Sequence, residues 1–195
     1  MKPFRILTIL LFISFITACS TILAQDQNTS AQQQAWMEYM TPGAGHSILA
    51  DHTGEWKTTT TYWLDPAAPP QKYEGTAKNE MIMGGRYLKS YFTGDMMGMP
   101  FEGMSLEGYD NAKKEYTSIW IDNFGTGTSI STGKYNEETK SITYTGTVYD
   151  PLSGKDVMIK EIIKTIDKDH HIMEMYSVVD GKEIKSMEVA FERKM

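Results

Sequence analysis

Short runs of alternating apolar and polar residues fill the chain from residue 54 almost to its end, and this pattern constrains the fold most. Alternation with a period of two is typical of strands with one buried face. Such runs cover about 54–64, 71–83, 86–93, 101–109, 114–122, 126–135, 139–149, 156–167, 170–180 and 183–193. No interval between them is long enough for a helix.

The intervals between the runs are rich in Gly, Pro, Asn and Asp, which favour turns. Most are two to five residues long, so consecutive strands should pair as antiparallel hairpins. An open sheet of ten such strands would have two exposed edges, and closure into a barrel removes them. The sequence therefore predicts an all-β fold, a single antiparallel up-and-down β-barrel of about ten strands. A short N-terminal helix or turn should precede it, where Trp36, Met37, Tyr39 and Met40 add apolar surface.

The two ends of this meander should meet. Lys57 should face water, and so should Glu188 and Glu192. These assignments turn two sets of side chains inward: Trp56, Thr58, Thr60, Tyr62 and Leu64 on the first strand, and Met187, Val189, Phe191 and Arg193 on the last. Because the first and last strands of a closed meander are antiparallel, Trp56 and Arg193 should lie together. A guanidinium over an indole contributes about 0.5 to 2 kcal/mol, and we interpret this pair as structural closure of one barrel end.

The N-terminus has the pattern of an export signal. Lys2 and Arg5 precede an apolar run at 6–16, which is too short for an ordinary membrane span. Cys19, the only cysteine, follows Ile16-Thr17-Ala18, and this resembles the lipobox of bacterial lipoproteins, in which the cysteine is acylated. The alternative is a secreted protein cleaved after Ala24, with Cys19 removed along with the signal.

These signals give a domain organisation. Residues 1–18 are predicted to be a signal peptide, 19–34 a flexible polar linker and 35–195 the barrel domain. The expected location is the cell envelope, with the protein membrane-anchored through lipid alone, and the alternative is a soluble periplasmic or secreted protein. The formal net charge of -6 argues against nucleic acid as a partner.

Several short motifs carry a family resemblance. Gly54-Glu55-Trp56 and Arg193 are similar to the Gly-x-Trp and C-terminal arginine of the calycin superfamily, which includes lipocalins and fatty-acid-binding proteins. From about Trp36 to Arg193 the chain resembles the bacterial domain of unknown function 1579 family. The ordered motifs are Thr41-Pro42-Gly43 with His46, Gly54-Glu55-Trp56, Gly84-Gly85-Arg86-Tyr87, Pro100-Phe101-Glu102-Gly103, Gly108-Tyr109-Asp110 and Trp120-Ile121-Asp122. The resemblance implies one lipocalin-like barrel and favours an internal apolar ligand, and it supplies no catalytic residues.

Methionine is unusually frequent, with 14 in the chain. Met96, Met97 and Met99 lie in a Gly-rich stretch before Pro100, where flexible thioethers could cap a cavity mouth. The plainer interpretation is core filling plus an apolar loop. The predicted ligand-binding residues are these three, together with Thr58, Thr60, Tyr62, Met173 and Met175.

Metal binding is a weaker alternative. His171, Met173 and Met175 share one strand face, and Met sulfur with imidazole suits Cu(I). His171 is also the histidine best placed to serve as a haem ligand. A plain core face explains the same spacing, so no metal or cofactor is predicted.

Catalysis finds little support in the sequence. It contains no nucleophile elbow, His-Glu-x-x-His helix or phosphate-binding loop, and the aspartates at strand ends are typical of turns. The expected function is binding of a small apolar or amphipathic molecule inside the barrel. The alternative is an envelope protein-interaction module whose barrel is filled by its own side chains. The sequence does not assign an oligomeric state.

Overall fold

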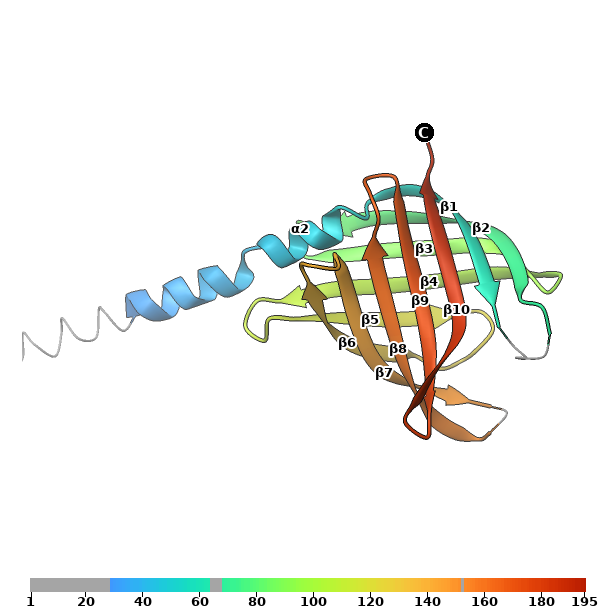
Figure 1. Ribbon diagram of the computed structural model, residues 1–195. Coiled ribbons are helices and arrows are strands. Elements are labelled where there is room, and N and C mark those ends of the chain that lie inside the picture. Colours follow the sequence, from blue (N-terminus) through green and yellow to red (C-terminus); the bar gives the residue numbers. More distant parts are fainter. Residues whose placement is uncertain (1–28, 64–67, 152) are drawn as a thin grey trace, which may run out of the picture. The chain divides into compact units, whose positions relative to one another are not determined.

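A computed structural model describes residues 29–63, 68–151 and 153–195 (Figure 1). The chain divides into two compact units, 1–41 and 42–195. In the first, residues 29–40 are helical and expose Trp36, Met37, Tyr39 and Met40. Residues 29–34, the end of the predicted flexible linker at 19–34, are helical, and Ala and Gln are good helix formers. The predicted signal peptide, Cys19 and the cleavage site after Ala24 lie outside the described residues.

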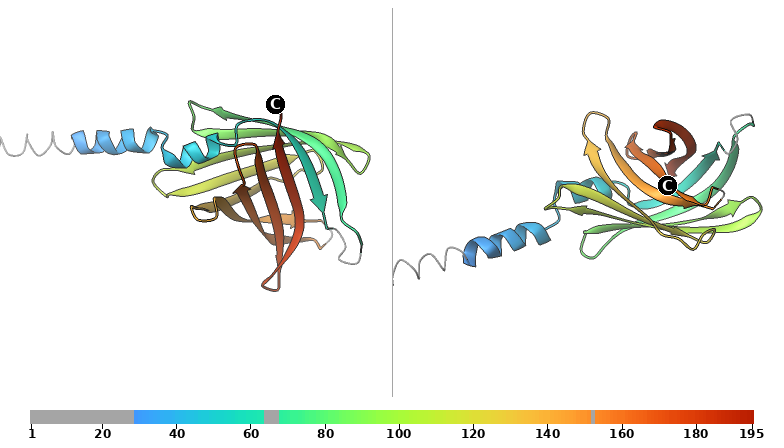
Figure 2. Two further views of the ribbon diagram at one scale, coloured as in Figure 1. Left: turned by 45° about the horizontal axis from the view of Figure 1, so that its top comes forward. Right: turned by 90° about the horizontal axis from the view of Figure 1, so that it is seen from below.

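The second unit is a closed antiparallel barrel in which each strand pairs with its neighbours in sequence and β1 pairs with β10. This confirms the predicted up-and-down topology. Figure 2 shows β1 and β10 side by side from a second direction. The elements are α2 (Ala44–Ala50), β1 (Gly54–Tyr62), β2 (Gln71–Ile82), β3 (Tyr87–Met96), β4 (Met99–Asp110), β5 (Glu115–Asp122), β6 (Ser129–Asn136), β7 (Ser141–Asp150), β8 (Lys155–Thr165), β9 (His170–Val179) and β10 (Lys182–Arg193).

Up-and-down connections place alternate turns at opposite ends of the barrel. We call the end with the β1–β2, β3–β4, β5–β6, β7–β8 and β9–β10 connections the mouth end. The other end, which we call the closed end, carries α2 and the remaining turns. There Leu49 of α2 is fully buried and belongs to one apolar cluster with Leu88, Tyr116, Ile142, Tyr144 and Ile163.

The β3–β4 connection differs from the sequence prediction. A Gly-rich loop was expected from Gly94 to Pro100, but the strands continue to Met96 and Met99 and leave a two-residue turn. Met97 and Gly98 both have positive φ, which is the type I′ geometry that matches the twist of paired strands. Gly94 lies within β3 and not in the turn. It allows β2 and β3 to pack closely, since a Cβ there would lie 3.1 Å from the Glu74 carbonyl oxygen.

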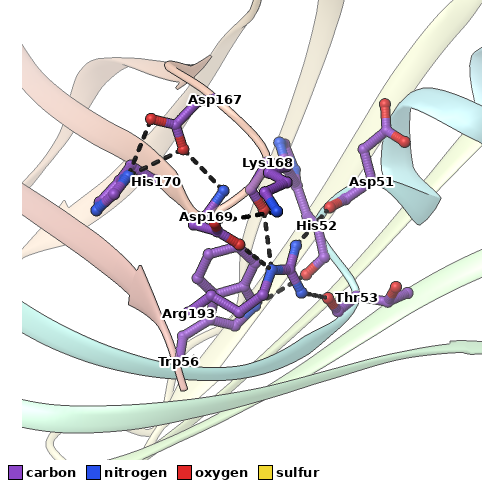
Figure 3. A network of polar contacts seen from close by, with 9 residues as sticks. All are labelled: Asp51, His52, Thr53, Trp56, Asp167, Lys168, Asp169, His170 and Arg193. Atoms are coloured by element: carbon purple, nitrogen blue, oxygen red, sulfur yellow. Dashed lines mark hydrogen bonds and ion pairs between the residues drawn. The ribbon is translucent and has the colours of Figure 1, made fainter. Parts of the chain in front are cut away.

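Trp56 and Arg193 are Cα partners in the β1–β10 register, and the guanidinium lies 4.1 Å from the centre of the indole ring (Figure 3). The same guanidinium donates hydrogen bonds to the carbonyl oxygens of Asp51, Thr53 and Lys168. It therefore links β10 to the segment after α2 and to the β8–β9 turn. A Cβ at Gly54, where φ is +123°, would lie 2.5 Å from Nη1 of Arg193, so the Gly-x-Trp glycine makes room for this side chain.

Replacing Arg193 with lysine should destabilise the barrel. Lysine keeps the charge, but it lacks the planar guanidinium whose N–H groups reach three divergent carbonyl oxygens. We expect the R193K variant to lose about 2 kcal/mol in free energy of unfolding, measured by urea denaturation. The control is R86K, because Arg86 donates hydrogen bonds to carbonyls of its own turn, Met83 and Gly84. Equal stability of R193K and R86K would contradict the structural role.

Candidate functional site

A small cavity of about 40 Å³ opens near the mouth end, between β1, β2, β3 and the start of β4. Its wall combines hydroxyl groups with apolar and aromatic side chains. The lining residues are Thr58, Thr60, Tyr62, Tyr73, Glu74, Gly75, Phe92, Thr93, Gly94, Asp95, Met96 and Phe101. Ligand pockets usually enclose about 300 Å³ or more, so this cavity has room for part of a ligand or a few water molecules.

Four of the predicted ligand-binding residues line this cavity: Thr58, Thr60, Tyr62 and Met96. The three hydroxyls come from alternate positions of β1 and thus from one face. Burial raises the pKa of Tyr62 to about 12, with smaller contributions from Asp122 and Tyr73, so its hydroxyl stays protonated at neutral pH. These three hydroxyls are therefore neutral hydrogen-bonding groups in a wall that also includes Glu74 and Asp95.

Aromatic rings extend the apolar side of the cavity. Phe92 meets Trp120 edge to face at 5.3 Å, and Phe101 stacks on the same indole at 6.4 Å between ring centres. Trp120 is fixed by a hydrogen bond from its Nε1 to Asp122, 2.7 Å long. Sequence reasoning missed Phe92 and Phe101 because inward facing was assigned only on the first and last strands.

The other predicted methionines lie elsewhere. Met97 is at the tip of the β3–β4 turn, Met99 begins β4, and both side chains are exposed and do not line the cavity. Met173 packs against both apolar clusters of the barrel. Met175 is half-buried opposite Glu161 on the next strand. The two β9 methionines thus line the barrel wall and not this cavity.

A pair of carboxyl groups points into the barrel further inside. Glu107 of β4 is buried and accepts a hydrogen bond from the Tyr144 hydroxyl, 2.8 Å long. Glu161 of β8 lies opposite Tyr144 in the register, on the face that buries Ile159 and Ile163. β4 and β8 are four strands apart in the barrel, and the two carboxyl groups lie near enough for the charge of Glu107 to act on Glu161.

Burial controls the charge of this pair. Desolvation, followed by the negative charge of Glu107, raises the pKa of Glu161 to about 8. Desolvation also raises the pKa of Glu107, against the opposing effect of the hydrogen bond from Tyr144. In the described part of the chain neither carboxyl group forms an ion pair with a Lys or Arg side chain. At neutral pH the pair therefore holds at least one proton.

Two histidines stack under the closed end. The ring of His171 lies between those of His52, at 4.6 Å, and Phe191, at 4.0 Å, with Trp56 edge-on. Burial lowers the pKa of His52 to about 4 and that of His171 to about 2, so both rings are neutral. His171 thus belongs to the closed end, whereas Met97 and Met99 are exposed at the opposite end. Among residues 29–63, 68–151 and 153–195, no three His, Cys, Asp or Glu side chains are arranged to hold a metal ion.

A family model described as "Protein of unknown function (DUF1579)" matches residues 41–193, nearly the whole of the barrel unit. The chain belongs to this family. The resemblance seen in the sequence motifs is thereby confirmed, and it covers the strands that build the cavity and the carboxyl pair. No curated protein matches the chain in sequence.

Solved structures share the fold of this family member at low sequence identity. The crystal structure of Rv2717c from M. tuberculosis aligns with a TM-score of 0.59 and 14% identity, covering 80% of this chain and 100% of that one. The S-type phycobiliprotein lyase CPES from Guillardia theta aligns with a TM-score of 0.53 and 8% identity, covering 82% and 96%. At these identities the likeness is one of fold. Within the described part of the chain, no helix is long and apolar enough to cross a membrane.

The pKa of Glu161 predicts a pH-dependent stability. Between the unfolded value of about 4.5 and the folded value of about 8, the folded state holds more protons than the unfolded state, so stability falls as pH rises through this window. The E161Q variant removes this term, and at pH 8 it should be more stable than the wild type by on the order of 2 kcal/mol. Urea denaturation at pH 5 and at pH 8 measures the difference.

The control for this experiment is E192Q, because Glu192 is exposed on the outer face of β10. The stability of E192Q to urea should still fall between pH 5 and pH 8, as that of the wild type does. If E161Q shows the same decline, the carboxyl pair does not set the pH dependence.

Proposed function

We propose that this DUF1579 domain binds a small apolar or amphipathic molecule that enters the barrel from the mouth end. The observation that carries the proposal is the cavity wall, on which Thr58, Thr60 and Tyr62 face the apolar side chains of Phe92 and Met96. Hydroxyls on one side and rings with a thioether on the other suit a ligand with a short polar group and an apolar body. Burial of the apolar part supplies about 25 cal/mol per Å² of surface removed from water.

The barrel interior offers a route by which the cavity can enlarge. Small side chains line the wall of β3, β4, β5 and β6, where Ser90, Ser105, Ser118 and Ser131 are buried. On β3, Phe92 lies between Ser90 and Met96, and Met96 stands at the mouth end of the strand. Because an unbranched thioether has three rotatable bonds, movement of Met96 could widen the cavity at the mouth end without displacing a strand.

The small cavity volume favours a second candidate, an envelope protein-interaction module with a filled barrel. In that case the outer surface, and not the interior, carries the function. The two proposals differ in whether a molecule occupies the interior of the native protein.

A cavity-filling variant tests the binding proposal. T60F places a ring where the cavity now lies, and we expect it to lower the occupancy of a copurifying ligand at least about fivefold. Native mass spectrometry of the full-length chain, compared with its denatured mass, measures the occupancy. The control is T145F, since Thr145 is exposed on β7 and Thr143 and Thr147 share its outward face. If the wild-type protein from several growth conditions shows no mass beyond that of the chain itself, the filled barrel is favoured.

We also propose that the protein is exported and anchored in the cell envelope by acyl chains on Cys19, with a soluble protein cleaved after Ala24 as the alternative. The support is the sequence Ile16-Thr17-Ala18-Cys19 after a short apolar run with Lys2 and Arg5 before it. The intact mass of the purified protein distinguishes the two. An acylated chain beginning at Cys19 is expected, and the C19A variant should lose both the acyl mass and membrane retention. A mature chain beginning at Gln25 would contradict the anchor.

A further inference from the structure

Glu107 and Glu161 present unpaired carboxyl oxygens to the interior of the barrel. Both occupy inward-facing positions, Glu107 opposite Ser118 in the register and Glu161 between Tyr144 and Met175. Glu107 is 6% exposed, and the Tyr144 hydroxyl donates to one of its oxygens, Oε2. Among the described residues, no group donates a hydrogen bond to Oε1 of Glu107 or to either oxygen of Glu161.

These unpaired oxygens border open space. In the described part of the chain, the buried polar side-chain atoms that are sealed among protein atoms without a partner are Asn79 Oδ1 and His171 Nδ1, both at the closed end. The oxygens of Glu107 and Glu161 are not among them, so each unpaired oxygen reaches space that a water-sized molecule can enter. Glu161 is accordingly half-buried although it faces inward. The pair therefore has room beside it for a polar group of a ligand.

The interior around the pair is acidic and has no counter-ion. Arg193 occupies the closed end, and Lys155 and Lys182 are exposed at the tips of the mouth end. Between these ends, the inward-facing positions of the described strands contain no Lys or Arg. Acidic side chains continue toward the mouth end, with Asp122 on β5 and with Glu74 and Asp95 in the cavity wall.

This distribution of charge selects among ligand head groups. A carboxylate would bring a further negative charge to the pair, and an uncharged head group would gain no ion pair. A divalent metal ion would lack a third His, Cys, Asp or Glu ligand among the described residues. An ammonium group would gain an ion pair that enclosed surroundings strengthen. Its binding would release the proton that the pair holds at neutral pH, so one cation replaces another.

A row of side chains leads from the pair to the mouth-end cavity. Glu161, Met175, Met187 and Tyr62 are successive register partners on β8, β9, β10 and β1, and Tyr62 lines the cavity. Three strand spacings separate Glu161 from Tyr62, about 14 Å along the wall. Met175 and Met187 are half-buried, and their unbranched side chains can pack against apolar groups of different shape. The wall thus offers an apolar path between the cavity and the carboxyl pair.

We propose that the bound molecule is an amphipathic amine, whose ammonium group pairs with Glu161 and Glu107 and whose apolar body lies against Met175 and Met187. This inference rests on the proposed ligand-binding function and names the chemical class of the ligand. The hydroxyl of Tyr144 holds Glu107 in place, and the ammonium group takes the oxygens that the protein leaves unpaired. The acidic groups toward the mouth end attract a cation to the entrance.

Calorimetric titration of the full-length C19A chain, which carries no acyl group that could enter the barrel, tests the amine directly. Decylamine, decanol and decanoate share one alkyl chain and differ in their head group. We expect decylamine to bind at least about tenfold more tightly than decanol at pH 7, and decanoate to bind more weakly than either. Titrations in phosphate and in Tris buffer count the protons released, and we expect about one for each decylamine bound.

The E161Q variant locates the binding site of the ammonium group. It should lower the affinity for decylamine about tenfold and leave that for decanol unchanged. It should also fold, because no described residue donates a hydrogen bond to the carboxyl group that it replaces. The control is E192Q, which removes a carboxylate from the outer face of β10 and should leave both affinities unchanged.

Three results overturn the proposal: equal affinity of the wild type for decylamine and decanol, binding of decylamine without proton release, or equal decylamine affinities of E161Q and E192Q. The first two need no variant, so they decide the question even if E161Q does not fold. The absence of decylamine binding also overturns it.

Native mass spectrometry separates this inference from the function beneath it. A copurifying ligand that E161Q loses and E192Q retains supports both proposals. A copurifying ligand whose occupancy is the same in E161Q and the wild type keeps the binding function and rejects the amine. The absence of a copurifying ligand, together with no binding of any of the three probes, rejects both.

Discussion

Pairing of β1 with β10 is the constraint on which the rest of the structure depends. It joins the two ends of the meander, so that no strand of the closed sheet is left with an unpaired edge. Arg193 secures the closure at one end, where its guanidinium covers Trp56 and holds the segment after α2 and the β8–β9 turn through their carbonyl groups. Gly54 has no side chain, which leaves the space that the guanidinium occupies.

Closure at one end makes the two ends of the barrel chemically different. At the closed end, Leu49 and the stacked rings of His52 and His171 fill the space beneath α2. Towards the mouth end the wall is less tightly filled, and the cavity meets a mixture of hydroxyls and aromatic rings. Between them lie Glu107 and Glu161, whose burial favours a neutral carboxyl group over two negative charges. The interior therefore combines buried polar side chains, among them Ser90, Ser105 and Ser118, with two apolar clusters.

The first and last strands show how far sequence reasoning reaches into the site. Lys57 and the pair Glu188 and Glu192 fixed the facing of β1 and β10, which is why Thr58, Thr60 and Tyr62 could be named in advance. The central strands gave no such marker. There Glu107 and Glu161 point inward although charged residues normally face water, so the usual rule would place them wrongly. The β3–β4 connection failed for another reason, since Gly94 is required by close packing within the sheet and not by a turn.

The sequence by itself determined the period of two, the short turns and the pairing of sequential strands, because these depend on local backbone preferences and on burying one face of each strand. It also determined the meeting of Trp56 with Arg193, which follows once the meander closes. Only the tertiary structure decided which side chains share the interior and how much space they leave. Glu107 and Glu161 are 54 positions apart in the chain, and Thr60 and Phe101 are 41 apart. Their approach depends on the tilt of the strands and the girth of the barrel, which no local pattern records.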